Sequence, residues 1–298
     1  MKILSFYPIH RSWINSIAEL FPEHSFELIE NKKIPCGPIE RKLWLGEIVP
    51  FVSNVKIVGE YGKVDHRNYD LILAWQNVYS SILAKHKWVK PVVLFIHNAG
   101  DRPPAKFKGP IVYNTYLSAE QAGDPTAPVY LGVRKASEIG EWTGEIPRGC
   151  VGNLDLLAGR RHVIDANFVG KLVSAKLIEQ IQGNLAWKDF ITIRRKLRFN
   201  LEVLQRANCN SFLESMRMGQ PCIAPDIRDY NKFITHGDNG FLYKTENDIE
   251  SIARKLNSDY DYTKQIGLRA KETIETHIDD EKRRKILEKV FEKALEDK

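Results

Sequence analysis

VVLFIHN, residues 92–98, is a run of five apolar residues that ends in a polar step at His97. Runs this short and this apolar, separated by helical stretches, are typical of strands that are buried on both faces of a parallel sheet. The first half of the chain is therefore predicted to be a Rossmann-like α/β domain. Its other predicted strands are KILSFYP (2–8), FELIE (26–30), NVKIV (54–58), DLILAW (70–75) and IVYNTY (111–116).

A second α/β domain is expected after a less regular stretch that follows residue 133. Glycines and a proline at 140–149 are typical of a connection between domains, and a chain of 298 residues exceeds the usual single-core domain. TENDIESIARKL (245–256) begins with a capping-box signature, which predicts a helix start. In this half we expect strands at 163–170, near 189–193, around Cys209 and at 222–225, and helices at 174–182, 200–207, 214–219 and 246–256.

The composition indicates a cytoplasmic protein. No stretch approaches the roughly 18 apolar residues of a spanning helix, and the N-terminus is too short and too strand-like for a secretory signal. The four cysteines stand far apart without a CxxC pair, which favours reduced thiols over a disulfide framework or a zinc site. We therefore predict no metal and no cofactor.

The charge of the chain favours a partner that is rich in phosphate. A net charge of +6 and a pI near 9.0 suit a nucleotide, a nucleic acid or an anionic membrane surface. The tail at 279–298 has apolar residues at helical spacing, which predicts an amphipathic helix packed on another part of the chain. Its lysines and arginines alternate with glutamates, which is more typical of a solvated face than of a nucleic-acid patch.

FVGKLVSAK, residues 168–176, is a candidate anion site. Gly170 ends a predicted strand, and Lys171 and Lys176 bracket the first turn of the helix expected next, with Ser174 as its cap. Backbone N–H groups and the helix dipole favour an anion at such a turn. The alternative is two solvated lysines on a surface loop.

Two further segments place polar groups where ligands bind in α/β sheets, at the carboxyl ends of strands. Glu214 lies at the predicted start of a short helix, and its carboxylate could accept hydrogen bonds from two ribose hydroxyls. Alternatively, this acid only stabilises its own helix N-terminus. His97 follows a buried strand and either faces the site or serves the core. Residues 235–243 form a glycine-containing turn.

The order of six segments resembles the GT-B glycosyltransferases of the retaining family 4 type. That family has, in this order, a strand ending in His, a strand ending in a polar step, a Gly-Val linker, a loop of the form fvGRl…KG, a helix and strand of the form EAMacGtPvV, and a dGxnGxLv turn. The matching segments here are LFIHNAG (94–100), IVYNTY (111–116), PVYLGV (128–133), FVGKLVSAK (168–176), ESMRMGQPCIAP (214–225) and HGDNGFLY (236–243).

The resemblance implies a role for each matched residue. Lys171, where the family usually has Arg, and Lys176 would bind the donor diphosphate and stabilise the leaving group. Glu214 would bind the ribose, and His97 would face the transferred sugar. With these roles the implied catalytic residues are His97, Lys171 and Lys176, and the implied donor-binding residues are Gly170, Lys171, Lys176, Glu214, Asp238, Asn239 and Gly240.

Two departures from the family pattern stand out. The family has an earlier Glu eight positions before the one that matches Glu214, and this chain has Arg206 there. The glycine pair after the first strand is replaced by PIHRSW (8–13), which offers His10 and Arg11 as possible acceptor or phosphate contacts. Sugar and acceptor contacts are therefore expected to differ from those of the family.

The sequence thus predicts an α/β protein of GT-B fold, with two Rossmann-like domains facing across a cleft. We expect an acceptor-side domain at 1–130, a donor-binding domain at 131–275, and a helix at 276–298 that packs back on the first domain. The implied reaction moves a hexose-type sugar from a UDP- or GDP-sugar to a glycan, lipid-linked or protein acceptor, with retention. A DNA-base glucosyltransferase, a nucleotide-sugar epimerase, a catalytically weak nucleotide-sugar-binding module and a homodimer stay open as alternatives.

Overall fold

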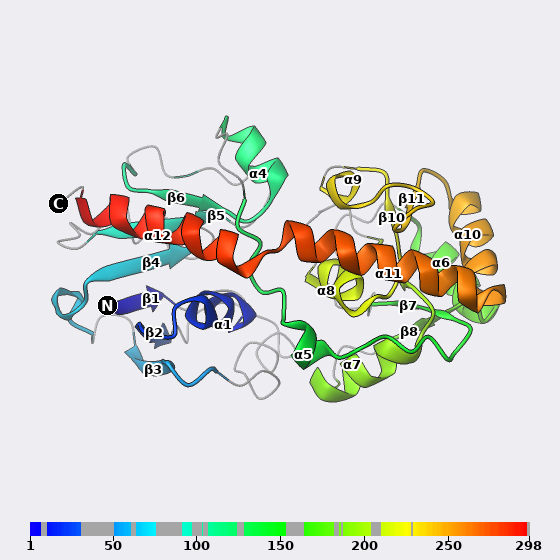
Figure 1. The fold of residues 1–298 in the computed structure, drawn as a ribbon, viewed down its shortest axis with the longest axis horizontal. Coiled ribbons are helices and arrows are strands. Elements are labelled where there is room, and N and C mark those ends of the chain that lie inside the picture. Colours follow the sequence, from blue (N-terminus) through cyan, green and yellow to red (C-terminus); the bar gives the residue numbers. More distant parts are fainter. Residues whose placement is uncertain are drawn as a thin grey trace. The chain divides into compact units, whose positions relative to one another are not determined.

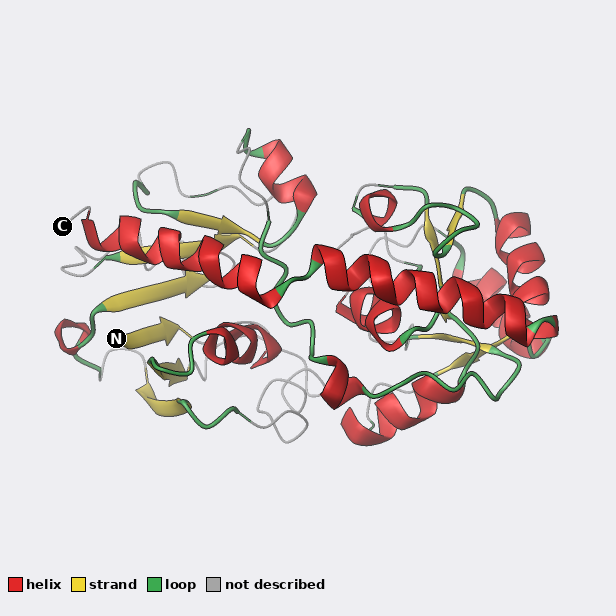
Figure 2. Ribbon diagram, in the orientation of Figure 1, coloured by secondary structure: helices red, strands yellow, loops and turns green. Residues whose placement is uncertain are grey.

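The structure is a computed structural model, and it divides the chain into two compact units (Figures 1 and 2). Unit 1 is Met1–Val133 with Ile278–Lys298, and unit 2 is Arg134–His277. No helix in the described part of the chain is long and apolar enough to cross a membrane. The described residues are 1–6, 11–30, 51–60, 64–75, 91–96, 103, 107–123, 128–152, 164–181, 185, 187–203, 210–227 and 229–296.

Unit 1 is built on a six-stranded parallel sheet of order β3-β2-β1-β4-β5-β6. The residues of β1, β4 and β5 are almost all buried, as the apolar runs in the sequence predict. The strand order reverses between β1 and β4. The strands are β1 (Lys2–Phe6), β2 (Ser25–Glu30), β3 (Val55–Glu60), β4 (Leu71–Trp75), β5 (Val92–Ile96) and β6 (Ile111–Tyr113).

Helices cover this sheet, and the last helix of the chain is one of them. Leu287, Phe291 and Ala294 of α12 are buried in the same core as the strands, and α12 contacts α1, β4 and β5 (Figure 1). α12 is therefore amphipathic, with its apolar stripe on the sheet of unit 1, whereas residues 276–277 of the predicted tail end α11 in unit 2. The helices are α1 (Arg11–Leu20), η1 (His66–Asn68), α4 (Tyr116–Gln121) and α12 (Asp280–Glu296).

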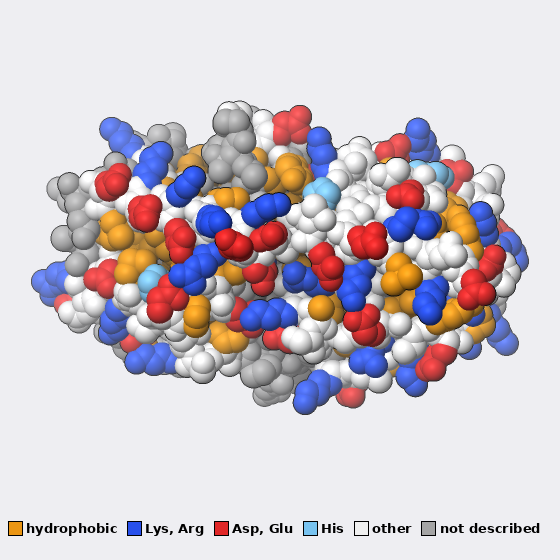
Figure 3. Space-filling view, in the orientation of Figure 1, with side chains coloured by type: hydrophobic (Ala, Val, Ile, Leu, Met, Phe, Trp, Pro, Cys, Tyr) orange, Lys and Arg blue, Asp and Glu red, His pale blue; other side chains and the backbone are white. Residues whose placement is uncertain are grey.

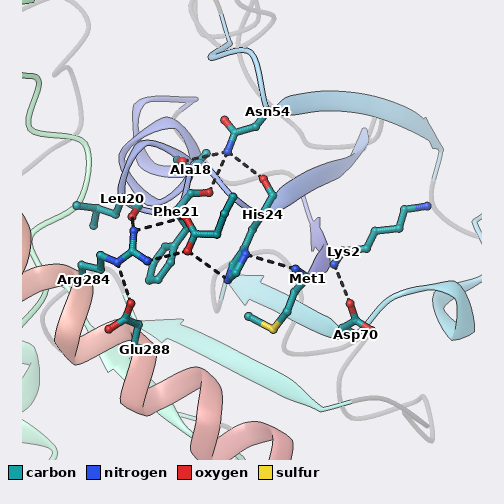
Figure 4. Close-up of polar contacts among 11 residues, drawn as sticks. Met1, Lys2, Ala18, Leu20, Phe21, His24, Asn54, Asp70, Arg284 and Glu288 are labelled. Atoms are coloured by element: carbon teal, nitrogen blue, oxygen red, sulfur yellow. Dashed lines mark hydrogen bonds and ion pairs between the residues drawn. The ribbon is translucent and has the colours of Figure 1, made fainter.

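Hydrogen bonds at the C-terminal end of α1 fix α12 in this position (Figure 4). The Arg284 guanidinium donates to the Leu20 carbonyl oxygen at 2.7 Å and to Glu23 Oε1 at 2.7 Å, and it lies over the Phe21 ring. The Asn54 side-chain amide lies within 3.2 Å of three carbonyl oxygens at the end of α1 and just after it. The carbonyl groups that a helix end leaves without partners are thus satisfied by side chains.

Unit 2 is built on a smaller parallel sheet of order β11-β10-β9-β7-β8. Its strands are β7 (Gly149–Val151), β8 (Ile178–Gln180), β9 (Asn200–Leu201), β10 (Cys222–Pro225) and β11 (Phe241–Tyr243). Its helices are α5 (Ala136–Ile139), α6 (Ala166–Ser174), α7 (Trp187–Lys196), α8 (Asn210–Met218), α9 (Tyr230–Phe233), α10 (Glu246–Ser258) and α11 (Tyr260–His277).

The two faces of the unit 2 sheet differ in polarity. One face is apolar, where Val151, Leu201 and Ile223 pack with residues of α6 and α10 in a single core cluster. The other face has Cys150, Asn200 and Cys222 side by side in the strand register. α8 lies over this polar face, because the Cys222 thiol is 3.7 Å from a carbonyl oxygen of α8. Hydrogen bonds, as well as apolar contact, therefore fix α8 on the sheet.

Several predicted elements of unit 2 are wrong. Residues 166–170 of the predicted strand at 163–170 belong to α6, whose N-cap Asp165 accepts a hydrogen bond from the Asn167 N–H. The predicted strand near 189–193 lies inside α7, and the predicted helix at 200–207 begins instead as β9. The predicted strand around Cys209 lies outside the described residues. The strand at 222–225 and the helix at 246–256 are confirmed, the latter with its capping box.

Candidate functional site

The strand order of unit 2 defines a topological switch point at the carboxyl ends of β7 and β9. From β7 the chain passes through α6 to β8 on one side, and α7 then leads to β9 on the other side of β7. In open parallel sheets, ligands bind outside the carboxyl ends of the strands at such a point. The residues that directly follow these two strands are Gly152 and Glu202. We take this edge as the candidate site.

Gly152 leaves space at the end of β7. A Cβ atom added there would meet no heavy atom of the described residues within 4 Å. Gly152 is exposed, and no side chain of its own shields its backbone. An accessible backbone N–H group is a suitable donor for an anion.

Glu202 connects the end of β9 to the first turn of α8. The side chain is 4% exposed, and its Oε1 accepts hydrogen bonds from Asn200 Nδ2 at 2.6 Å and from Ser211 Oγ at 2.8 Å. The Tyr243 hydroxyl donates to the Glu202 carbonyl oxygen at 3.0 Å. A buried carboxylate bonded in this way holds the strand end and the helix start in fixed register.

Glu214 is the fifth residue of α8, not its first, so the premise that it begins a helix is wrong. It is 4% exposed, and Arg134 Nε and Arg194 Nη1 each lie 3.9 Å from its carboxylate oxygens. Burial raises the pKa of Glu214 to about 7, and the two arginines oppose this effect. Near neutral pH the carboxyl group is therefore poised between its neutral and ionised forms.

Arg194 is the most buried cation of this cluster, with 1% of its surface exposed. Its Nη2 donates to the Ser211 carbonyl oxygen and to Ser215 Oγ, both on α8. Ser215 in turn donates to Gln220 Oε1 at 2.7 Å, and Gln220 Nε2 donates to the Arg194 carbonyl oxygen at 3.0 Å. This closed set of hydrogen bonds joins α7 to α8 beside Glu214.

The two lysines of the predicted anion site lie elsewhere. Lys171 is in the last turn of α6, and Lys176 follows its C-terminus, two residues before β8 begins. The Leu177 carbonyl oxygen bonds the N–H of Gly149, the first residue of β7, so this end of α6 is at the amino edge of the sheet. The premise of a helix N-terminus at the carboxyl edge is therefore wrong, because α6 runs antiparallel to the strands.

Gly170 and Ser174 are helical residues of α6. Gly170 is its fifth residue and exposed, and Ser174 does not cap a following helix but donates from Oγ to the Gly170 carbonyl oxygen at 2.9 Å. Lys176 has a φ of 57° at the position where a helix commonly ends in glycine, and its N–H bonds the Val173 carbonyl oxygen. These features terminate a helix.

The predicted turn at 238–240 has structural roles in unit 2. Asn239 is buried, its Oδ1 accepts from the Thr235 N–H at 2.8 Å, and its Nδ2 donates to Phe233 O and Thr273 Oγ1. Asp238 is exposed and forms an ion pair with Arg269 at 2.9 Å. At Gly240 even a methyl group would be crowded, because an added Cβ would lie 3.2 Å from a β10 carbonyl oxygen and 3.3 Å from the Ile234 side chain.

Three predicted site residues of unit 1 cannot be placed from side-chain contacts. His97 and His10 lie outside the described residues, and Arg11 begins α1 with its side chain outside them. Their predicted roles stay predictions.

Glu202 and Arg194 were not predicted as members of the site. A helix was predicted at 200–207. The end of β9, which Glu202 follows, was therefore not recognised as a strand end. Arg194 stands in the basic run RRKLR, where composition suggests a solvated surface. The only signal for Arg194 was its place in the apolar pattern of α7, in register with the buried Ile191 and Leu197.

A separate cavity of about 500 Å³ lies at the carboxyl ends of β10 and β11. Asp226, Lys244 and His236 line it, and the first two form an ion pair at 3.3 Å. The cavity is at the β11 side of the sheet and not at the switch point. We therefore retain the β7 and β9 ends as the candidate site.

Comparison with known proteins supports the fold through structure and not through sequence. No family model matches this sequence, and no curated protein matches it. Anabaena Alr3699/HepE in complex with UDP-glucose has a TM-score of 0.66 at 14% identity, covering 98% of this chain and 99% of that chain. HepE in complex with UDP gives 0.63 at 15% identity, covering 98% and 100%.

Two other solved structures match over almost their whole length. Sucrose-phosphate synthase (tll1590) from Thermosynechococcus elongatus has a TM-score of 0.68 at 8% identity and covers 100% of both chains. A glycosyltransferase from Rickettsia africae ESF-5 has 0.62 at 13% identity, covering 100% of this chain and 99% of that chain. Identities this low establish the fold alone. The two parallel sheets with flanking helices confirm that this chain has the GT-B fold of glycosyltransferases.

Proposed function

We propose that this protein is a glycosyltransferase that moves a sugar from a nucleoside-diphosphate sugar to an acceptor hydroxyl. The observation that carries the proposal is the switch point of unit 2, where Gly152 follows β7 with open space beside its Cα atom and α8, which follows β9, holds the buried carboxylate of Glu214. The fold adds support, because structures of similar fold over 98% of this chain are complexes with UDP or UDP-glucose.

In this proposal unit 2 binds the donor. Glu214 accepts hydrogen bonds from the ribose hydroxyls, and the backbone at Gly152 donates to the diphosphate. Lys171 and Lys176, at the amino edge of the sheet, are not assigned to the diphosphate.

We further propose which sugar is transferred and how the reaction proceeds. The sugar is a hexose that is transferred with retention and without a metal ion, and the departing phosphate takes the proton of the acceptor hydroxyl. Fixed hydrogen-bond donors at the diphosphate lower the barrier because negative charge develops there as the glycosidic bond breaks. His97 faces the transferred sugar in this scheme, and the acceptor is a glycan, a lipid-linked sugar or a protein.

A DNA-base glucosyltransferase is the less supported alternative. Such an enzyme needs basic side chains that are free for DNA, but side chains of the basic run 194–198 have partners within unit 2: Arg194 is buried, Lys196 pairs with Glu145 at 3.2 Å, and Arg198 lies over the Tyr260 ring. Figure 3 shows basic and acidic side chains interspersed over the face in view, including α11 and α12. A nucleic-acid site normally concentrates basic charge on one surface.

The proposal is tested by incubating the protein with UDP-, GDP- and TDP-sugars. We expect one donor class to raise the melting temperature and to release its nucleoside diphosphate, with release unaffected by a chelator. Binding without release would favour the catalytically weak binding module. Neither binding nor release with any donor would contradict the proposal.

Glu214→Gln supplies the variant for this test. A hydrogen bond to a charged group is worth about 1.5–3 kcal/mol, so the variant should bind the donor about 10-fold to 100-fold more weakly at pH 8. Exposed Glu272→Gln on α11 is the matched control and should bind the donor as the wild type does. Equal affinities of all three proteins would remove Glu214 from the ribose site.

A further inference from the structure

Arg194 lies 3.9 Å from Glu214, the proposed ribose contact, but belongs to none of the segments that resemble known glycosyltransferases. It comes from α7, and only 1% of its surface is exposed. A guanidinium in this position keeps its charge, so the protein must compensate a cation in its interior. The contacts that compensate the charge of Arg194 indicate which residue it affects.

The guanidinium contacts two serines and Glu214, all on α8. Nη2 donates to the Ser211 carbonyl oxygen and to Ser215 Oγ, two residues that lie one turn apart on α8. Nη1 and Nε make no hydrogen bond to any described residue, and Nη1 lies 3.9 Å from Glu214 Oε2. That distance is too long for a hydrogen bond but short enough for a strong charge interaction in a buried environment.

We propose that Arg194 is a positioning residue of the nucleotide site, which keeps Glu214 ionised for the ribose hydroxyls and so sets the pH range in which the donor binds. The inference rests on the proposed function, since it assigns a regulator to the same site. The strongest charged neighbours of Glu214 are Arg194 from α7, Arg134 from the segment before α5, and Glu138 from α5. Among them, Arg194 lowers the pKa of Glu214 the most and so opposes the effect of burial most strongly.

The charge interaction decides whether the carboxyl group can accept hydrogen bonds. A carboxylate has two acceptor oxygens for the two ribose hydroxyls, whereas a protonated acid gives up one of these positions to its own proton. Burial alone favours the protonated form, and an opposite charge within about 4–6 Å lowers a carboxyl pKa by about 1–3. Without Arg194 most of the Glu214 population would be protonated at pH 7.

The first experiment measures this coupling without any ligand. Carboxyl ¹³C NMR of glutamate-labelled protein, with the Glu214 resonance assigned by its loss in Glu214→Gln, should give a wild-type midpoint near 7. In Arg194→Gln the midpoint should rise by at least about 1. Arg194→Lys retains a cation and should titrate between the two. An unchanged midpoint in Arg194→Gln would overturn the proposal.

The second experiment measures UDP affinity by calorimetry between pH 6 and 9. Wild-type affinity should rise with pH as Glu214 ionises, and Arg194→Gln should be about fivefold weaker at pH 7 and recover by pH 9. Lys196→Gln removes a half-exposed charge from the same helix and should leave the profile unchanged. A role of Arg194 in folding alone would lower affinity equally at every pH, and that result would overturn the proposal.

Two further outcomes remain decisive. If Arg194→Gln does not fold, a pH titration of the wild type replaces it. The guanidinium ¹⁵N resonances of Arg194 should then shift at the same pH at which Glu214 titrates. Resonances that stay constant across this pH range would overturn the coupling. A wild type that binds no UDP at any pH, together with a raised Glu214 midpoint in Arg194→Gln, would refute the proposed function while supporting the link between the two residues.

Discussion

Glu214→Gln should change how the stability of unit 2 depends on pH. Burial raises the pKa of Glu214 from its usual 4.5 to about 7, so the folded state binds this proton more tightly than the unfolded state. The stabilisation from this proton is fully present below pH 4.5 and is lost as pH rises through 7. Between pH 5 and pH 8 the wild type should lose about 2.5 kcal/mol of unfolding free energy through this group.

The glutamine variant has no such proton to lose. Relative to that of the wild type, its free energy of unfolding should therefore increase by about 2.5 kcal/mol from pH 5 to pH 8. Effects of the substitution that do not depend on pH cancel in this comparison, including the altered contact with Arg194. The prediction concerns only the change with pH.

Amide hydrogen exchange read by mass spectrometry is the suitable assay, because a protein of two compact units need not unfold in one step. The relevant peptides cover β9 and β10, and wild type and variant are compared at the same pH so that intrinsic exchange rates cancel. Glu272→Gln provides the matched control, and any effect that it shares is subtracted. A wild-type minus variant difference that is equal at pH 5 and pH 8 would refute a raised pKa of Glu214.

Three substitutions test the local structure of unit 2. Gly170 lies inside α6 with open space around it, so Gly170→Ala should stabilise unit 2 by about 0.5–1 kcal/mol. UDP affinity should not change, and weaker UDP binding would indicate that this segment belongs to the site. Lys176→Gly relieves a positive φ at a helix end and should raise the unfolding free energy by about 0.5–1 kcal/mol in a denaturant titration, whereas a loss would contradict the assigned backbone geometry. Asn239→Ala removes three hydrogen bonds of a buried amide and should destabilise unit 2 by about 1–3 kcal/mol, and a melting temperature equal to that of the wild type would show that the turn does not depend on it.

The fold of unit 1 could be predicted from sequence because its central strands are buried on both faces. Five-residue runs such as VVLFI have no polar positions, and such runs between helices fit few structures other than a parallel sheet. The amphipathic stripe of the tail also identified its buried face, since Leu287 and Phe291 recur at helical spacing.

Unit 2 was harder to predict because its strands are very short. β9 has two residues, which is too few for any periodicity, and β7 has three. The segment ANFVGKLVS contains enough apolar residues for a strand, but its buried residues Phe168, Val169 and Leu172 have helical spacing. Its resemblance to a strand-glycine-lysine motif favoured a strand instead. Lys171 and Lys176 were therefore predicted at the carboxyl edge of the sheet, which is the wrong edge.

The candidate site was only partly predictable for a related reason. Glu214 was found because it lies in a recognisable helix-and-strand segment. Glu202 and Arg194 act as buried charges, and a single sequence gives no direct sign that a charged residue is buried. Their role depends on contacts between β9, α7 and α8, which the chain brings together only after folding.

The central claim is that the nucleotide binds at the carboxyl ends of β7 and β9. Hydrogen-exchange mass spectrometry with and without saturating UDP-glucose tests it most directly. We expect slower exchange in peptides that cover β9 and α8, and no change at residues 170–176 at the end of α6. Slower exchange at 170–176 without any change in β9 and α8 would contradict it.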